Sequence, residues 1–183
     1  MSPTDLLQPG SLGVIPTDTV YGLVARAADQ AAVSRLYDLK KREQKPGTLI
    51  AASIKQLEEL GLKHRYLKAV EQYWPGAVSV VIQAADPALA YLHQGKMSLA
   101  VRIPDDKQLQ TLLEQTGALL TSSANQPGEP PAVDIDQARQ YFGDSVDFYQ
   151  DGGDLSGRQP STLIRIIDDA VEILREGAVK IKS

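Results

Sequence analysis

The chain of 183 residues contains no cysteine. Disulfides, zinc sites with thiolate ligands and cysteine nucleophiles are therefore excluded. No segment approaches the roughly 20 consecutive apolar residues of a membrane-spanning helix. The first residues also lack the basic segment followed by an apolar one that marks a signal peptide. We therefore expect a cytoplasmic protein without a membrane segment.

Histidine is nearly as scarce, with only His64 and His93 present. Both stand in polar stretches away from any serine-rich turn, so we expect both on the surface and no catalytic dyad. They offer no metal-binding pair at helical spacing, so no tight metal site is expected. The GxxxxGK[ST] and GxGxxG loops are absent as well, which excludes nucleotide binding in the P-loop or Rossmann manner.

Aromatic residues make up 5% of the chain, and the formal net charge is −4. A surface that is basic throughout, as tight sequence-independent binding of nucleic acid requires, is therefore not expected. The composition does not exclude a local basic groove.

Short apolar runs alternate with amphipathic helical patterns along the whole chain, without a repeat or linker. This pattern predicts one α/β domain spanning residues 1–183. Strands are expected at 12–15, 48–52, 78–83, 98–103, 118–122, 146–149, 162–167 and 171–174. Helices are expected at 29–41, capped by Asp29, and at 54–60, 64–73, 106–116 and 134–142.

The expected helix 29–41 places Val33, Leu36, Tyr37 and Lys40 on one face, so its core-facing stripe ends in a cation. Near the C-terminus, the link 168–170 is too short for a parallel crossover, so strands 162–167 and 171–174 should form an antiparallel hairpin. The sheet is therefore expected to be mixed and twisted, with helices packed on it.

Cations gather at the end of the first long helix, in the run KKREQK from Lys40 to Lys45. They could bind a triphosphate through point charges and the arginine fork. They could equally complement the helix macrodipole.

Polar residues follow expected strands in the segments 16–23 and 120–128, where hydroxyls, amides and turns could bind a ligand or simply form ordinary loops. Arg102 lies inside an apolar strand. A buried arginine needs a partner, either a structural carboxylate or a bound anion.

Several separated motifs occur in one order along the chain. They are PTDTVYGL (16–23), KKREQKP (40–46), SLAVRIPD (98–105), SAN (123–125), DGGDLSGRQPSTLIRI (151–166) and ILREGA (173–178). Together they resemble the threonylcarbamoyl-AMP synthase family, in its YrdC-like single-domain form. The resemblance implies a YrdC-like fold, neither Rossmann nor P-loop.

Enzymes of this family condense L-threonine, bicarbonate and ATP to L-threonylcarbamoyl-AMP and pyrophosphate, with Mg²⁺ accompanying the ATP. A separate threonylcarbamoyl transferase complex then modifies the adenosine beside the anticodon of tRNA. By resemblance the chain is a nucleotidyltransferase with these substrates and this partner, and a weak contact with tRNA stays open. Such chemistry requires positioned reactants and charge neutralisation rather than a protein nucleophile.

The resemblance also implies site residues. Threonine would be contacted by Thr19, Arg102, Ser123 and Ser161. ATP would be contacted by Lys40, Arg42, Lys45, Ser98, Asn125, Val133 and Arg175. Lys40, Arg42 and Arg102 would be the catalytic residues.

This sequence departs from the family pattern at Glu43, Ser79 and Pro127. Glu43 lowers the positive charge expected around the nucleotide. The helix before the first strand is shortened, and the second domain of longer members is missing, so a stand-alone catalytic domain is expected. The alternatives are an RNA-binding maturation factor of the same fold and a relative that binds threonine or nucleotide without turnover.

Overall fold

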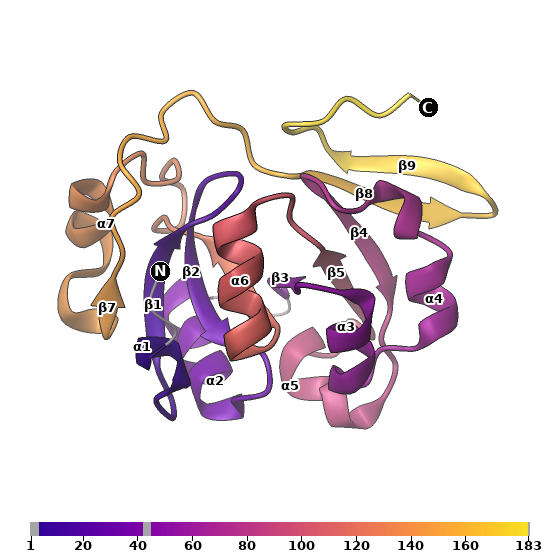
Figure 1. Ribbon diagram of the computed structural model, residues 1–183, viewed down its shortest axis with the longest axis horizontal. Coiled ribbons are helices and arrows are strands. Elements are labelled where there is room, and N and C mark those ends of the chain that lie inside the picture. The colour runs from indigo at the N-terminus through magenta and orange to yellow at the C-terminus, as the bar shows by residue number, and fades with distance from the viewer. Residues whose placement is uncertain (1–3, 42–44, 183) are drawn as a thin grey trace.

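The computed structural model describes residues 4–41 and 45–182 and is built on one nine-stranded sheet, in the order β7-β1-β2-β6-β3-β5-β4-β8-β9 (Figure 1). Its strands are β1 (Leu12–Pro16), β2 (Tyr21–Arg26), β3 (Thr48–Ile50), β4 (Val78–Gln83), β5 (Ser98–Arg102), β6 (Leu119–Ser123), β7 (Phe148–Tyr149), β8 (Thr162–Ile167) and β9 (Ala170–Arg175). Strand β3 pairs parallel to β5, and β4 pairs parallel to β8, whereas β2 and β6 pair antiparallel. The predicted mixed α/β sheet is therefore confirmed.

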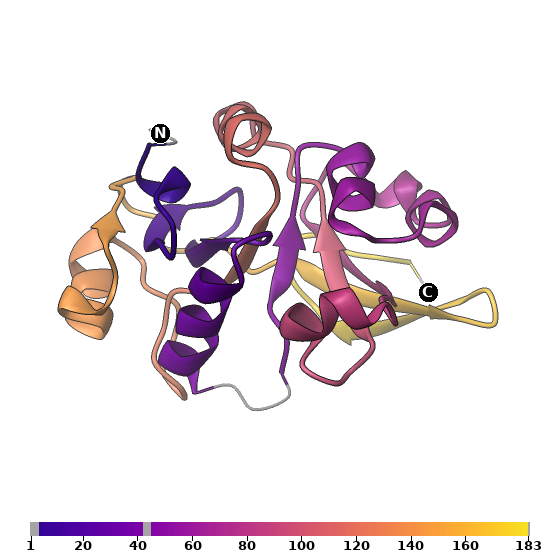
Figure 2. The same cartoon turned by 90° about the horizontal axis from the view of Figure 1, so that it is seen from below.

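Helices cover both faces of the sheet (Figure 2). They are α1 (Thr4–Leu7), α2 (Gln30–Lys40), α3 (Ile54–Leu60), α4 (His64–Lys68), α5 (Ala90–His93), α6 (Lys107–Thr116) and α7 (Ile135–Phe142), with 3₁₀ turns at Glu71–Tyr73, Pro87–Leu89 and Gly143–Ser145. On one face, leucines of α6 and α1 pack against Ile15, Val24, Ile50 and Leu119. On the other face, α2 and α5 contribute to the larger core. Among the described residues, no helix has the length and apolar character needed to cross a membrane.

Helix α2 begins as the sequence predicts. The Asp29 side chain accepts a hydrogen bond of 3.0 Å from the backbone N–H of Ala32, which satisfies a donor that the first helical turn leaves unpaired. The apolar stripe of the helix is buried, and Lys40 at its end is 5% exposed. The prediction that this stripe ends in a core-facing cation is confirmed.

The hairpin of β8 and β9 is antiparallel, as predicted, and β8 has the predicted bounds. Asp168 and Asp169 form its turn with positive φ angles of 48° and 62°. Aspartate tolerates this left-handed conformation better than most residues, so a tight turn is possible without glycine. Strand β9 forms one edge of the sheet.

Three expectations were wrong. The segment 64–73 is not one helix, because Val70 leaves helical geometry (φ −122°, ψ 5°) between α4 and the 3₁₀ turn. Strand β2 was not predicted, because the polar residues that precede it resemble a loop. Its residues Tyr21 to Ala25 are nevertheless buried. His93 is 4% exposed rather than on the surface. Its ring Nδ1 accepts hydrogen bonds from the backbone of Gly95 and Met97 and so fixes the turn into β5.

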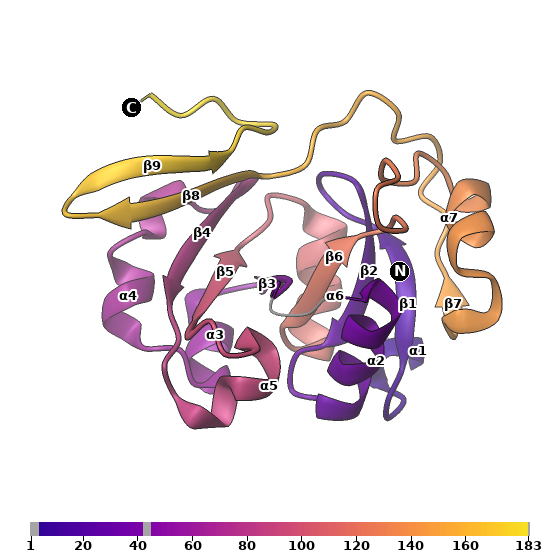
Figure 3. The ribbon, with the colours of Figure 1, turned by 180° about the vertical axis from the view of Figure 1, so that it is seen from behind.

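A long connection between β7 and β8, which we call the strap (residues 150–161), passes over the ends of the central strands (Figures 1 and 3). The Tyr21 hydroxyl accepts a hydrogen bond of 2.8 Å from Gly152 N–H and donates one of 2.8 Å to the Gly153 carbonyl. Burial raises the pKa of Tyr21, so its phenol stays protonated and can donate. The strap is thereby fixed to strand β2.

Candidate active site

A cavity of about 400 Å³ opens on the face of the sheet that α6 partly covers. Its floor consists of strand residues that share this face: Gly22, Thr48, Ala100, Arg102, Thr121 and Leu163. The pairing register places Thr48 opposite both Ala100 and Thr121, so these side chains point the same way. The cavity therefore lies on the same face of the sheet as the leucines of α6, next to the part of the face that they cover.

The floor is open where its residues are small, at Gly22, Thr48, Ala100 and Thr121. A Cβ atom added at Gly22 would stand 2.6 Å from the Thr121 hydroxyl, closer than real Cβ atoms approach. Neighbouring positions on the same strands, such as Leu23 and Leu120, are large and fill the opposite core. Small residues on one face and large ones on the other thus create a pocket without a gap in the sheet.

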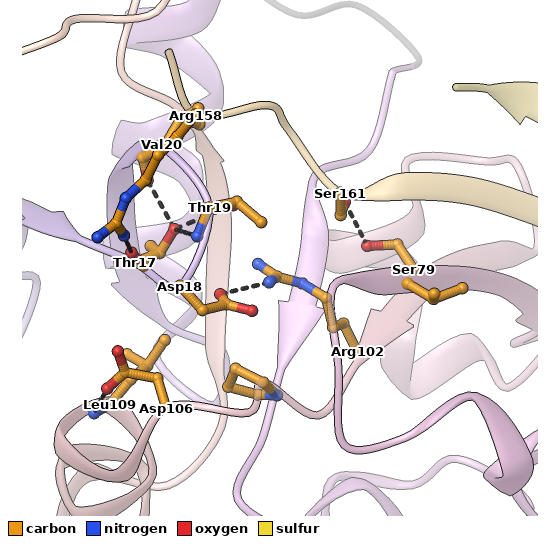
Figure 4. Close-up of polar contacts among 12 residues, drawn as sticks. Thr17, Asp18, Thr19, Val20, Ser79, Arg102, Asp106, Leu109, Arg158 and Ser161 are labelled. Carbon is orange, nitrogen blue, oxygen red and sulfur yellow. Dashed lines mark hydrogen bonds and ion pairs between the residues drawn. The ribbon is translucent and has the colours of Figure 1, made fainter. Parts of the chain in front are cut away.

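Thr19, for which the resemblance predicts a contact with threonine, lies in the loop 17–20 between β1 and β2 and lines the pocket. Thr17 organises this loop, because its hydroxyl donates 2.6 Å to the Val20 carbonyl and accepts 3.2 Å from Thr19 N–H. The hydroxyls of Thr17 and Thr19 are 3.1 Å apart. Arg158 of the strap adds a contact of 3.4 Å to the Thr17 carbonyl (Figure 4). Thr19 is therefore held at a defined position on the pocket wall.

Arg102 ends β5, lines the pocket, and pairs with Asp18 of the loop 17–20 (Figure 4). The two side chains are 4% and 8% exposed, respectively. Of the two partners left open by the sequence, the structure thus provides the structural carboxylate. Within residues 4–41 and 45–182, however, the buried Nε of Arg102 has no acceptor. Asp18 therefore satisfies only part of the hydrogen-bonding capacity of the Arg102 guanidinium.

Ser123 and Asn125 form a turn after β6 and both line the pocket. Behind them, the Lys40 ammonium donates to the Ser123 carbonyl at 2.9 Å, and to the Asn125 carbonyl and side-chain Oδ1 at 2.8 Å each. The Ser123 hydroxyl donates to the same Oδ1 at 2.6 Å. The Asn125 amide donates to the Glu129 carbonyl at 2.8 Å. Lys40 therefore binds the turn itself, where the sequence analysis expects it to face the nucleotide.

Ser161 lies on the opposite wall, at the start of the C-terminal hairpin. Its hydroxyl is 2.8 Å from that of the fully buried Ser79 on β4. Arg175, which also lines the pocket, donates 3.1 Å to the Ser161 hydroxyl and 2.8 Å to its carbonyl. Ser79, a departure from the family pattern, thus contacts the pocket-lining Ser161 from a fully buried position.

The remaining expected residues lie elsewhere or cannot be placed. Ser98 is half-buried at the start of β5, away from the Arg102 end. Val133 is exposed, and its backbone is engaged, since its N–H donates 2.9 Å to Gln137 and its carbonyl accepts 2.8 Å from Leu155 N–H. Lys45 is exposed next to Pro46, which lines the pocket. Arg42 and Glu43 lie outside the described residues.

The residues that could hold Mg²⁺ are few. Across the described residues, no group of at least three histidine, aspartate or glutamate side chains could hold a metal ion. Asp18, which is close to the pocket, is engaged by Arg102. A magnesium ion at this site would therefore be held mainly by the phosphates of a nucleotide and by water, a common arrangement for this ion.

Sequence reasoning gave no site role to the pocket residues Thr48, Ala100 and Leu163. Gly22 and Thr121 lie in the candidate segments 16–23 and 120–128 but were given no individual role. The available signal was Gly22 inside an apolar strand, because a glycine in a strand often marks the close approach of another group. The pairing of Asp18 with Arg102 joins residues 84 positions apart. No local pattern reports such a contact.

The fold and the pocket define a class of α/β domain in which an open face of a mixed sheet carries a polar cavity that contains an arginine. Comparison with known proteins narrows this class. The Sua5/YciO/YrdC family model, described as "Telomere recombination", matches residues 5–177. The chain therefore belongs to the Sua5/YciO/YrdC family.

Curated relatives with threonylcarbamoyl-AMP synthase names are similar over most of the chain. A putative threonylcarbamoyl-AMP synthase of Mycobacterium tuberculosis is 34% identical, over 98% of this chain and 84% of the relative. A threonylcarbamoyl-AMP synthase of Idiomarina loihiensis is 32% identical, over 85% of this chain and 87% of the relative.

Solved structures agree with this assignment. P. abyssi Sua5 complexed with L-threonine is 28% identical with a TM-score of 0.83, covering 96% of this chain but only 52% of that one. The chain thus spans about half the length of P. abyssi Sua5. E. coli YciO shares the fold with a TM-score of 0.83 at 22% identity, covering 98% of this chain and 89% of that one.

Proposed function

We propose that this protein is an L-threonylcarbamoyladenylate synthase, which condenses L-threonine, bicarbonate and ATP to L-threonylcarbamoyl-AMP and pyrophosphate. The product would serve the threonylcarbamoyladenosine modification of tRNA beside the anticodon. The observation that carries the proposal is the pocket-lining, buried Arg102, whose Nε has no acceptor in the described part of the chain. A buried guanidinium with an unused donor suits a small substrate carboxylate.

In this proposal threonine binds across the pocket between the loop 17–20 and the hairpin. Arg102 would bind its carboxylate or the carbamate, while the hydroxyls of Thr19, Ser123 and Ser161 would contact the remaining polar atoms. All four residues line the same cavity. Its walls come from well-separated elements, so they can hold the reactants in one orientation.

The chemistry then requires no nucleophile from the protein. The threonine amine attacks the carbon of bicarbonate, water leaves, and a carbamate forms. A carbamate oxygen next attacks the α-phosphorus of ATP, and the bond to the β-phosphate breaks to release pyrophosphate. The protein would hold the reactants and neutralise the charge that develops, and cationic donors and fixed hydroxyls are suited to this task.

The nucleotide would lie between the turn 123–125 and Arg175, which line the pocket from opposite walls. Asn125, Arg175, Lys45, Ser98, Val133 and Arg42 are the proposed ATP contacts. We infer that Lys40 contributes by holding the turn, given its bonds to Ser123 and Asn125. Mg²⁺ would arrive with the triphosphate. The product would pass to a separate threonylcarbamoyl transferase complex.

The test is pyrophosphate release by the purified protein with ATP, magnesium and bicarbonate, with and without L-threonine. We expect release that requires both threonine and bicarbonate, with L-serine as the control amino acid. Threonine binding measured by calorimetry without any pyrophosphate release would instead identify a relative that binds without turnover. Absence of both binding and release would refute the proposal.

The alternative, an RNA-binding maturation factor without turnover, is not favoured. The curated relatives of this chain carry synthase names. The pocket is a polar cavity rather than a row of aromatic side chains on which bases could stack. A weak contact with tRNA is compatible with either function, and gel-shift titration with a tRNA would detect it.

A further inference from the structure

Asp18 is the charged partner of Arg102, and the proposed function gives it no role. It stands in the loop 17–20 between Thr17 and Thr19, which both line the pocket. Its Oδ1 receives the Arg102 Nη1 donor (Figure 4). The carboxylate is 8% exposed, so water screens this contact little.

The geometry of the guanidinium decides which donors remain. An arginine presents donors in a planar fork, and the edge formed by Nε and Nη2 matches the two oxygens of a carboxylate. Asp18 takes Nη1, at the other end of the group. Within the described ranges, the buried Nε has no acceptor, and no bond from Nη2 is seen either. The carboxylate-matching edge of Arg102 is therefore the edge that Asp18 leaves unused.

The loop gives Asp18 a fixed position before any ligand binds. The Thr17 hydroxyl donates to the Val20 carbonyl and accepts from Thr19 N–H, closing the loop around Asp18. One short loop thus carries both a proposed threonine contact, Thr19, and the anchor of the proposed carboxylate-binding arginine. Any shift of Asp18 would turn the guanidinium relative to Thr19.

We propose that Asp18 is a positioning residue: it holds Nη1 of Arg102 so that the Nε–Nη2 edge faces the carboxylate, or the carbamate, of the substrate. The proposal rests on the proposed function, because it assumes that threonine binds in this pocket. Asp18 would thus orient the guanidinium as well as neutralise its charge. Orientation and charge neutralisation can be separated by experiment, because they predict opposite effects for two substitutions of Asp18.

The variants are Asp18→Asn and Asp18→Glu. Asparagine keeps an oxygen acceptor at the same place but removes the negative charge. Glutamate keeps the charge but is longer by one methylene and displaces the guanidinium. The matched controls are Asp106→Asn and Asp106→Glu, because Asp106 accepts 2.9 Å from Leu109 N–H as the cap of α6. Figure 4 places Asp106 close to the same region without a drawn bond to Arg102.

Calorimetric titration with L-threonine gives the first readout. We expect Asp18→Glu to raise the Kd about tenfold or more, the size of one lost charge-assisted hydrogen bond, and Asp18→Asn to stay within about threefold of wild type. The Asp106 controls should bind threonine as wild type does. Any result in which Asp18→Glu binds as tightly as Asp18→Asn, or more tightly, overturns the positioning role.

Spectra of protein with ¹⁵N-labelled arginine give a second readout that does not depend on the substrate. The Arg102 Nε–H signal, assigned with Arg102→Lys, should keep its position in Asp18→Asn and move in Asp18→Glu. In wild type it should shift on addition of L-threonine and not of L-threoninamide, which lacks the carboxylate. Wild type that fails to bind threonine refutes the proposed function, and the Nε–H positions in the two variants then still decide the role of Asp18.

Discussion

Lys40 differs from most lysines because its ammonium is used inside the protein. Its donors reach the carbonyls of Ser123 and Asn125 and the Asn125 side chain. Burying an ammonium costs free energy unless hydrogen bonds replace its hydration. These bonds do so, and in return the ammonium fixes the turn 123–125 at the pocket wall.

Replacing Lys40 with methionine tests this role. We expect the free energy of unfolding to fall by about 2 to 3 kcal/mol, because buried carbonyl oxygens lose a charged donor. Urea denaturation measures the change. Lys41→Met is the matched control, since Lys41 is exposed, and it should stay within about 0.5 kcal/mol of wild type. Equal stability of both variants would contradict the structural role of the Lys40 ammonium.

At the scale of elements, a buried hydroxyl is one of the contacts that fix the strap. Tyr21 on β2 bonds to Gly152 N–H and to the Gly153 carbonyl of the strap. Tyr21 is 0% exposed, so water cannot replace a lost bond easily. The strap also carries Arg158, which contacts the loop 17–20.

Tyr21→Phe should therefore lower the free energy of unfolding by about 1 to 3 kcal/mol, the cost of leaving buried backbone groups unpaired. The Gly152 amide should also exchange with solvent faster, which hydrogen-exchange measurements would detect. Tyr149→Phe is the control, because its hydroxyl bonds to the Gly143 carbonyl at 2.7 Å in an exposed setting. A loss in the control as large as in Tyr21→Phe would speak against a special role of the strap contact.

Elements with strong local patterns could be predicted from the sequence. Strands 78–83 and 162–167 and helix 54–60 have the expected bounds, because each is bounded by clear turns or caps. Strand β2 was missed because the polar residues before it resemble a loop and because Gly22 stands near the start of its apolar run. His93 was misplaced because its burial depends on backbone donors in a turn that its own segment does not predict.

The candidate site was predictable only in part. Thr19, Ser123 and Ser161, named through the family resemblance, line one cavity, and their contacts with threonine stay predictions. The helical periodicity predicted that Lys40 faces the core, but no local pattern could show which groups its ammonium binds. That outcome depends on acceptors more than 80 residues away, at separations of 83 and 85 positions. Long-range contacts of this kind are a property of the packed fold.

At the scale of the whole molecule, two aspartates join the N-terminal segment to distant elements. Asp29 accepts 2.6 Å from Gly10 N–H, and Asp147 accepts 2.8 Å from Leu12 N–H and pairs with Arg35 at 2.7 Å. Burial favours the neutral form of both carboxyls. At Asp29, hydrogen bonds from backbone N–H groups outweigh this effect of burial. At Asp147, the hydrogen bonds from Arg35 and from Leu12 N–H outweigh it. The pKa of each carboxyl therefore lies below its usual value.

Because these pKa values are lower in the folded state, both groups contribute stability above the unfolded value of about 3.9, and this contribution disappears as the pH falls through the folded values. We expect the free energy of unfolding, measured by urea titration, to decrease between about pH 4.5 and pH 2.5. Asp147→Asn should be less stable at neutral pH and show a shallower decrease. An identical pH dependence in this variant would exclude Asp147 as a contributor.

The parallel pairing of β4 with β8 joins residues 78–81 to residues 162–165 and brings Ser161 and Arg175 to a pocket whose other walls lie earlier in the chain. During synthesis, Thr19, Arg102 and the turn 123–125 leave the ribosome well before that last wall. A nascent chain therefore cannot assemble the full pocket until residue 175 has emerged. A ligand that contacts every wall can stabilise only chains that have been synthesised beyond residue 175. Substrate in the cell would therefore stabilise the completed fold and would not assist the early steps of folding.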